Sequence, residues 1–164
     1  MNGDEAAVVE IGHGTLMEQL RRKRAEAASH TTVDLAVPGY KGDIVARYQL
    51  IDVLVEGKEI QERLQRQFEK DDDRMHFGMI DTLIAACTGL YFRNDEGQLE
   101  PIDPDGQGPA QYDHRLAAAF GYEAESARDA LVKLFNGNNL AIRAHALRLS
   151  EWMADPSRPP LGEA

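Results

Sequence analysis

Five histidines and one cysteine are the side chains of this chain with the widest range of possible chemistry. They are His13, His30, His76, Cys87, His114 and His145. The ligands of a structural zinc site usually come in pairs that lie roughly three to six positions apart in the chain. No two of these residues have such a spacing. The sequence therefore predicts no metal site and no cofactor site.

Two of these residues could act alone, His145 as a general base and Cys87 as a nucleophile. Cys87 lies within a run of apolar residues at helical spacing, which is typical of an inert core cysteine. His145 lies in a predicted helix, where we expect a packed or surface histidine. No group that would activate either residue is evident, and we expect that the protein is not an enzyme.

Two acidic stretches could hold a divalent cation. Asp71-Asp72-Asp73 lacks the alternating ligand spacing of a calcium loop, so it is interpreted as the start of a helix. Segment 94–105 contains Asp95, Asp103 and Asp105, but prolines interrupt it and the distal glutamate of a calcium loop is missing. We interpret it as a polar loop.

The net charge of −10 is unevenly distributed. Residues 94–130 contain nine acidic and two basic side chains, a net charge of −7. Nucleic-acid binding requires a basic surface, so nucleic acid is not the expected partner. One basic cluster, Arg21-Arg22-Lys23-Arg24, is interpreted as the solvated face of a helix, with a basic binding arm as the alternative.

The length of 164 residues, with 43% hydrophobic residues, predicts one folded domain. No apolar run reaches the length of about 18 residues that a membrane span needs, and the first residues lack the basic start of a secretory signal. A single cysteine is compatible with a reducing cytoplasm. We expect a soluble intracellular protein without a membrane partner.

Period-2 alternation on both sides of Pro38 and Gly39 predicts a β-hairpin over 33–51. Its first strand places Val33, Leu35 and Val37 on one face. In its second strand, Ile44 and Ala46 share one face, and the other face carries Val45, Arg47 and Tyr48. Such a hairpin is not stable alone and must pack on other elements.

Most of the remaining chain has helical periodicity. Helices are predicted over residues 15–29, 56–70, 75–91, 114–120, 126–135 and 138–154. The first is expected to begin with Thr15 and Glu18 as a capping box. A second short hairpin is predicted over 91–100. The expected fold is α+β and mainly α-helical, with the hairpin packed on a helical bundle. Residues 1–14 are expected to be flexible, 15–154 to form the domain and 155–164 to form a disordered tail.

The last predicted helix is the candidate partner-binding element, because its apolar residues spread over more than one face. The candidate residues are Leu140, Ala144, Leu147, Trp152 and Met153. Aromatic side chains and methionines often make the adaptable contacts of an interface. The alternative is that Trp152 anchors this helix to its own core.

Several short segments of this chain form a recognisable pattern. The turn Val37–Tyr40, read as VPGY, leads into a strand that ends in Ala46-Arg47-Tyr48. The further segments of the pattern are Asp81–Ile84, Cys87–Tyr91, Ala130–Phe135, Asn138–Ile142, His145 and Glu151–Met153. With these segments, the chain from Val33 to Ala154 resembles the tail assembly chaperones of long-tailed, siphovirus-type actinobacterial phages.

The resemblance implies a protein that binds the tape measure protein and helps recruit the major tail protein during virion morphogenesis. It implies action in the cytoplasm of the infected bacterial host, absence from the mature virion, and a longer form made by programmed frameshift near the end of the reading frame. Self-association stays open. The alternative is another phage protein, such as a head–tail connector or a minor tail component.

Overall fold

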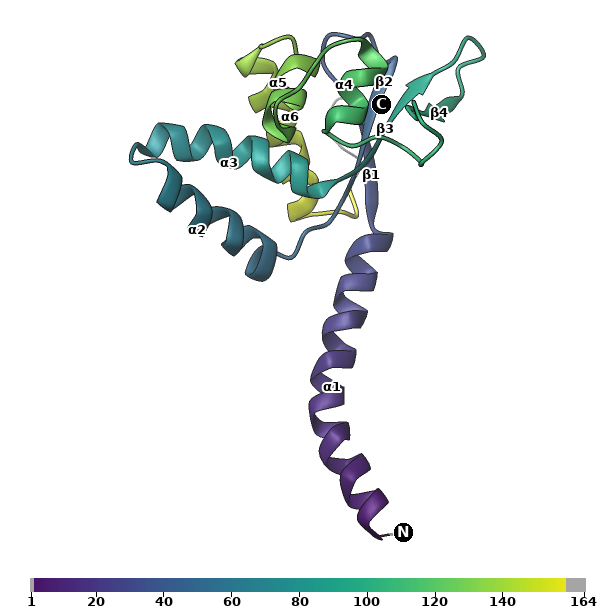
Figure 1. Ribbon diagram of the computed structural model, residues 1–164, viewed down its shortest axis with the longest axis vertical. Coiled ribbons are helices and arrows are strands. Elements are labelled where there is room, and N and C mark those ends of the chain that lie inside the picture. Colours follow the sequence, from purple (N-terminus) through teal and green to yellow (C-terminus); the bar gives the residue numbers. More distant parts are fainter. Residues whose placement is uncertain (1, 159–164) are drawn as a thin grey trace.

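A computed structural model describes residues 2–158 of the chain, with side chains from residue 15 onward. It is a mainly helical α+β fold, as the sequence predicts, and its strands form one antiparallel sheet (Figure 1). The sheet has the order β1-β2-β3-β4. Its strands are β1 (Thr32–Ala36), β2 (Ile44–Gln49), β3 (Cys87–Arg93) and β4 (Leu99–Pro101).

Both predicted hairpins are present. β1 pairs with β2 around the Pro38-Gly39 turn, and β3 pairs with β4 around a turn after Asn94. In the second turn the Asn94 side chain accepts hydrogen bonds from the backbone N–H groups of Glu96 and Gln98, at 3.0 and 2.9 Å. This side-chain bonding to the nearby backbone is the reason that asparagine favours turns.

The residues that the structure describes also form seven helical segments. They are α1 (Asn2–His30), η1 (Val53–Gly57), α2 (Lys58–Gln67), α3 (Asp71–Ala86), α4 (His114–Phe120), α5 (Ala127–Leu134) and α6 (Asn139–Ala154). Helices α3 and α6 pack on each other and contact β2 and β1 respectively, so the core lies between these helices and the sheet. Within the described residues, the structure contains no helix that combines the length and the apolar character of a membrane span.

The N-terminal helix differs from the prediction. It includes residues 2–14, which were expected to be flexible, and Thr15 lies inside it rather than at its N-cap. Figure 1 shows α1 projecting away from the rest of the molecule. At the other end, part of the predicted tail is a turn in which Arg158 N–H donates to the Asp155 carbonyl. Residues 159–164 lie outside the described part of the chain.

The predicted helix over 75–91 is wrong in its last turn. The chain leaves the helix at Ala86, and Cys87–Tyr91 belong to the central strand β3. The apolar residues of this segment have a spacing that is compatible with a helix and also with a strand. In the strand, Cys87, Gly89 and Leu90 are all buried. A Cβ atom at Gly89 would lie 2.7 Å from Cβ of Pro109, so the residue at this position must be glycine for the loop to cross the strand this closely.

Tyr48 faces the core with 0% exposure, so its predicted place beside Arg47 on the other face is wrong. Strict alternation along β2 puts Tyr48 on the same face as Ile44 and Ala46, which are also buried. The register of β2 against β3 shifts at this point, because Arg47 pairs with Gly89 and Tyr48 with Cys87. Thr88 is therefore the extra residue of a β-bulge in β3.

Inside the core, Tyr48 is the centre of a short hydrogen-bonded chain. Its hydroxyl lies 2.6 Å from the Tyr112 hydroxyl and 2.7 Å from Nε2 of His145. All three residues are fully or almost fully buried. These hydrogen bonds join β2, the segment before α4, and α6. Burial lowers the pKa of His145 to about 3, and the positive charge of Arg148 contributes further.

The neutral form of His145 fits this site for a structural reason. A charged imidazole needs acceptors at both nitrogens, but Nδ1 of His145 is buried without a hydrogen-bond partner among the described residues. Burial also raises the pKa of Tyr48 and of Tyr112 well above its usual value of 10, so both hydroxyls stay protonated and can donate.

A second buried polar site joins three helices. The carboxylate of Asp81 on α3 is 5% exposed and accepts hydrogen bonds from Arg63 on α2 and from Arg128 on α5. The distances are 3.1 Å from Arg63 and 2.8 Å from both Arg128 nitrogens. Burial alone would raise the pKa of Asp81, but the bonds from the two arginines outweigh it and the pKa lies below its usual value.

Stacked rings hold the same arginine. The rings of Phe68 and Phe77 lie 4.5 Å apart and nearly parallel. The guanidinium of Arg128 lies over both, 4.9 Å from the centre of the Phe77 ring. Because cation–π contacts and ion pairs share this one guanidinium, α2, α3 and α5 are fixed together at one point.

The lowered pKa of His145 predicts a stability loss in mild acid. The unfolded chain takes up a proton on this residue near pH 6.5, whereas the folded chain does so only near pH 3, so the free energy of unfolding falls as the pH drops through this window. The expected slope is about 1.4 kcal/mol per pH unit between pH 6 and 4.5. Urea denaturation at a series of pH values measures it.

The variant His145→Gln removes this titration, so its stability should change less with pH over the same range, even if it is lower at pH 7. His114→Gln, at an exposed position of α4, serves as the matched control and should keep the wild-type slope. Carboxylates with a lowered pKa, such as Asp81, lose their contribution to the free energy of unfolding only below about pH 4. An unchanged slope in His145→Gln would contradict the assignment.

The Asp81 site predicts a second effect on stability. Asp81→Asn keeps the side-chain shape but removes the charge that pairs with two arginines. We expect a loss of about 2 kcal/mol, at the lower end for a buried pair because both arginines are partly solvated. The control is Asp71→Asn, which removes an ion pair with Arg74 from a 95% exposed side chain and should cost about 0.5 kcal/mol or less. Equal midpoints of urea unfolding for the two variants would refute this.

Candidate partner-binding site

Helix α6 has one buried and one exposed face. The buried face consists of Ile142, His145, Ala146, Leu149 and Trp152. The exposed face includes three of the predicted partner-binding residues, Leu140, Ala144 and Leu147, which we call the α6 stripe. Leu140 is 76% and Leu147 is 51% exposed. Spacings of four and three residues align these side chains along one side of the helix.

The other two predicted residues do not belong to this surface. Trp152 is 4% exposed and lies in the core, so its prediction as a partner-binding residue is wrong and the alternative, an anchor for its own helix, is correct. Met153 is half-buried and packs against the core. The burial of both side chains follows from the helical period, because positions 152 and 153 lie three and four residues after the buried Leu149.

Local sequence determines where α6 begins. Asn136 and Gly137 have left-handed φ values of 55° and 70°, which reverse the chain after α5. The side chain of Asn138 then accepts a hydrogen bond from the Ala141 N–H at 3.1 Å and caps the helix. The Tyr40 hydroxyl donates to the carbonyl of Leu134, which ties the first hairpin to this corner.

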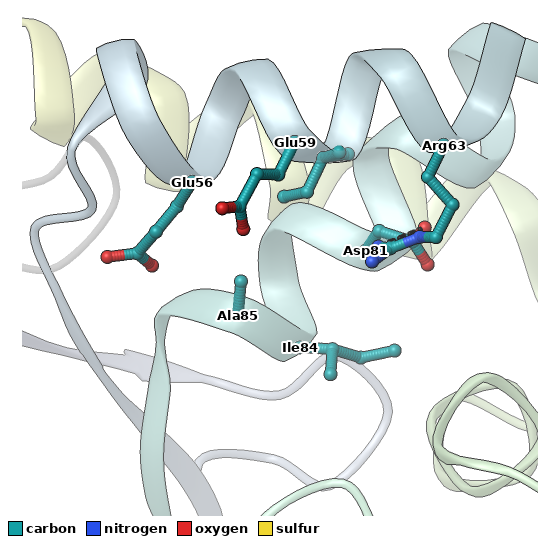
Figure 2. A pocket seen from close by; sticks show the side chains of 7 residues that line it. Glu56, Glu59, Arg63, Asp81, Ile84 and Ala85 are labelled. Atoms are coloured by element: carbon teal, nitrogen blue, oxygen red, sulfur yellow. Dashed lines mark hydrogen bonds and ion pairs between the residues drawn. The ribbon is translucent and has the colours of Figure 1, made fainter.

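A small acidic hollow lies between α2 and α3 (Figure 2). It has a volume of about 270 Å³ and is lined by Glu56, Glu59, Arg63 and Asp81, among others. Figure 2 shows Arg63 reaching across to Asp81, while the two glutamates lie further along the hollow. Because Arg63 and Arg128 pair with Asp81, this carboxylate joins the helices and is not free to act as a base.

The acidic loop that was weighed as a calcium site holds an arginine instead. The Arg115 guanidinium donates to Asp103 at 3.0 Å and to Asp105 at 2.6 Å. It also donates to the carbonyls of Gly108 and Pro109. Hydrogen bonds from Arg115 lower the pKa of Asp105. The described residues contain no cluster of metal-ligating side chains, Asp71–Asp73 included.

Neither candidate for catalysis is positioned for it. Burial raises the pKa of the Cys87 thiol to about 12, so the nucleophilic thiolate is not available near neutral pH. His145 lies in the core and is hydrogen-bonded to Tyr48. Both residues therefore have the structural roles that the sequence favoured.

The structure also reveals an apolar hollow that sequence reasoning missed. It has a volume of about 850 Å³ and lies between β4 and α4, and we call it the β4–α4 hollow. Its lining consists of Ile44, Phe92, Pro101, Ile102, Pro104, Ala119 and Phe120, with Glu100 and Asp103 as its acidic members. These residues come from four separate segments, so no local pattern could have indicated it.

Further exposed apolar side chains lie on the N-terminal side of the molecule. Val53, Leu54 and Val55 in η1 are 54–67% exposed. Leu16, Met17 and Leu20 of α1 are 53–57% exposed. The consecutive apolar residues Val53-Leu54-Val55 are a sequence signal that could have indicated the exposed group in η1.

Comparison with known proteins gave no match: no family model, no curated protein and no solved structure is similar to this chain. A proposal for its function therefore starts from the sequence motifs and from the surfaces described above.

Proposed function

We propose that this protein is a phage tail assembly chaperone that binds the tape measure protein and helps to recruit the major tail protein. It would act in the cytoplasm of the infected host and be absent from the finished virion. The observation that carries the proposal beyond the motif resemblance is the α6 stripe, a row of solvent-exposed apolar side chains on an ordered helix.

A tape measure protein is a long helical chain with apolar surface before it is assembled. Recognition of amphipathic helices generally uses apolar anchors at spacings of three and four residues. Leu140, Ala144 and Leu147 have this spacing, and the small Ala144 between the two leucines allows a partner helix to approach closely.

The rigid attachment of α6 supports the same role. The helix is capped by Asn138, and His145 and Trp152 hold its opposite face in the core. A helix whose backbone is already ordered loses less conformational entropy when a partner binds than a segment that must fold first. The α6 stripe is thus presented as a preformed strip for a mobile helical partner.

The test is co-expression with the tape measure protein encoded beside it, followed by co-purification and size exclusion. The wild-type chain should increase the soluble amount of tape measure protein and elute with it. The double variant Leu140→Asp/Leu147→Asp should weaken the complex by at least about a hundredfold, because burying each leucine contributes roughly 1.5–3 kcal/mol.

Gln61→Asp/Gln65→Asp is the matched control, since it adds two charges at exposed positions of a different helix, α2. It should bind like the wild type. Failure of the wild-type chain to form any complex would overturn the proposal. Detection of the chain in purified virions would favour the alternative, a head–tail connector or minor tail component.

A further inference from the structure

The described half of α1 lacks the packing that normally stabilises a helix. From Leu16 to Ala27 every side chain is exposed, and Figure 1 shows the helix extending away from the other elements. One ion pair, between Arg24 and Asp52 at 3.2 Å, joins its described side chains to the body. Most helical stability in proteins comes from packing of an apolar face, so α1 has the character of a segment that a partner covers.

The residues of α1 indicate what kind of surface would bind this helix. Leu16 and Leu20 lie one turn apart on the same face, with Met17 beside them, and the basic run Arg21–Arg24 follows directly. Arg21, Arg22 and Lys23 form no ion pair within the described part of the chain. A matching surface needs an apolar depression with acidic groups at its rim.

The β4–α4 hollow of this same protein has these properties. Its lining is apolar, with the ring of Phe120 38% exposed, and Glu100 and Asp103 are its charged members. Asp103 is paired with Arg115, whereas Glu100 is exposed and has no ion pair among the residues that the structure describes. The segment around the hollow, residues 94–130, has a net charge of −7, whereas residues 15–30 of α1 carry four basic and two acidic groups.

A helix cannot reach the hollow of its own chain in this fold. α1 joins the sheet at Thr32, which pairs with Gln49 at one end of β2. The hollow contains Ile44 and Phe92, which pair with each other at the opposite end of β2. α1 continues away from the sheet, so the two complementary surfaces can meet only between molecules (Figure 1).

We propose that α1 of one copy docks in the β4–α4 hollow of a second copy. Leu16 and Leu20 enter the hollow, and the basic run lies beside Glu100 and Asp103. Each copy offers one helix and one hollow, so the contact is heterologous and adds copies in sequence. This inference does not depend on the proposed function, since it uses α1 and the hollow rather than the α6 stripe.

Pairing of α1 with another α1 fits the residues less well. In a parallel pair, the four consecutive basic residues would lie against their own copies, and like charges in such positions repel. Lys23 follows Leu16 by seven residues, so the apolar repeat of a coiled coil is broken within the described helix.

Sedimentation velocity of the full chain over a wide concentration range tests the proposal. The wild type should exceed the monomer mass of 18.2 kDa, increasingly so at higher concentration. Leu16→Asp/Leu20→Asp removes the apolar face of α1. Ala119→Arg fills the hollow from an exposed position of α4 without changing a core residue. Each variant alone should sediment as a monomer.

A mixture of these two variants is the decisive arm. The first retains an intact hollow and the second retains an intact α1, so together they should form a heterodimer of twice the monomer mass. A charge exchange adds to this test: Arg21→Glu/Arg22→Glu should weaken association at least tenfold, and adding Glu100→Lys should recover most of the loss.

The α6 variant Leu140→Asp/Leu147→Asp should associate like the wild type, which separates this interface from the proposed chaperone function. Circular dichroism of each variant verifies that the fold is kept. A wild type that stays monomeric at all concentrations, an Ala119→Arg variant that still associates, or a mixture that stays monomeric would each overturn the proposal.

Discussion

The Tyr48 side chain is the single point on which most of the described fold depends. Its hydroxyl must find partners because an unpaired polar group in the core is costly. Tyr112 and His145 supply them, at 2.6 and 2.7 Å. Since these residues come from β2, the segment before α4, and α6, one set of hydrogen bonds specifies how the sheet, the loop and the last helix meet. Apolar packing alone would allow more than one arrangement of α6 on the sheet.

This constraint explains how the binding surfaces are displayed. Once His145 and Trp152 hold one side of α6 in the core, the helical period places Leu140, Ala144 and Leu147 in solvent. In the same way, the Asp81 site holds α2 and α5 against α3. The α6 stripe consequently lies on an element whose position is determined from inside the molecule.

Much of this architecture could be predicted from the sequence. Both hairpins, α4, α5 and α6, and the cap at Asn138 follow from local patterns that act within a few residues. The predicted helix over Cys87–Tyr91 failed because contacts between residues distant in the sequence determine the structure there. This segment is a strand, with a bulge at Thr88, because it pairs with β2, and no local periodicity contains that pairing. The orientation of Tyr48, in contrast, follows from the alternation of β2 itself. The β4–α4 hollow collects residues from four segments and has no local signal at all.

The loop around Arg115 has a consequence for how its carboxylates are neutralised. Acidic loops of similar composition in other proteins commonly recruit a calcium ion to neutralise their carboxylates, and their order then depends on the ion concentration outside the molecule. Here a covalently attached guanidinium occupies the centre of the loop and contacts Asp103 and Asp105 directly. The loop therefore carries its own counter-ion, and that counter-ion belongs to the same chain as the carboxylates that it neutralises.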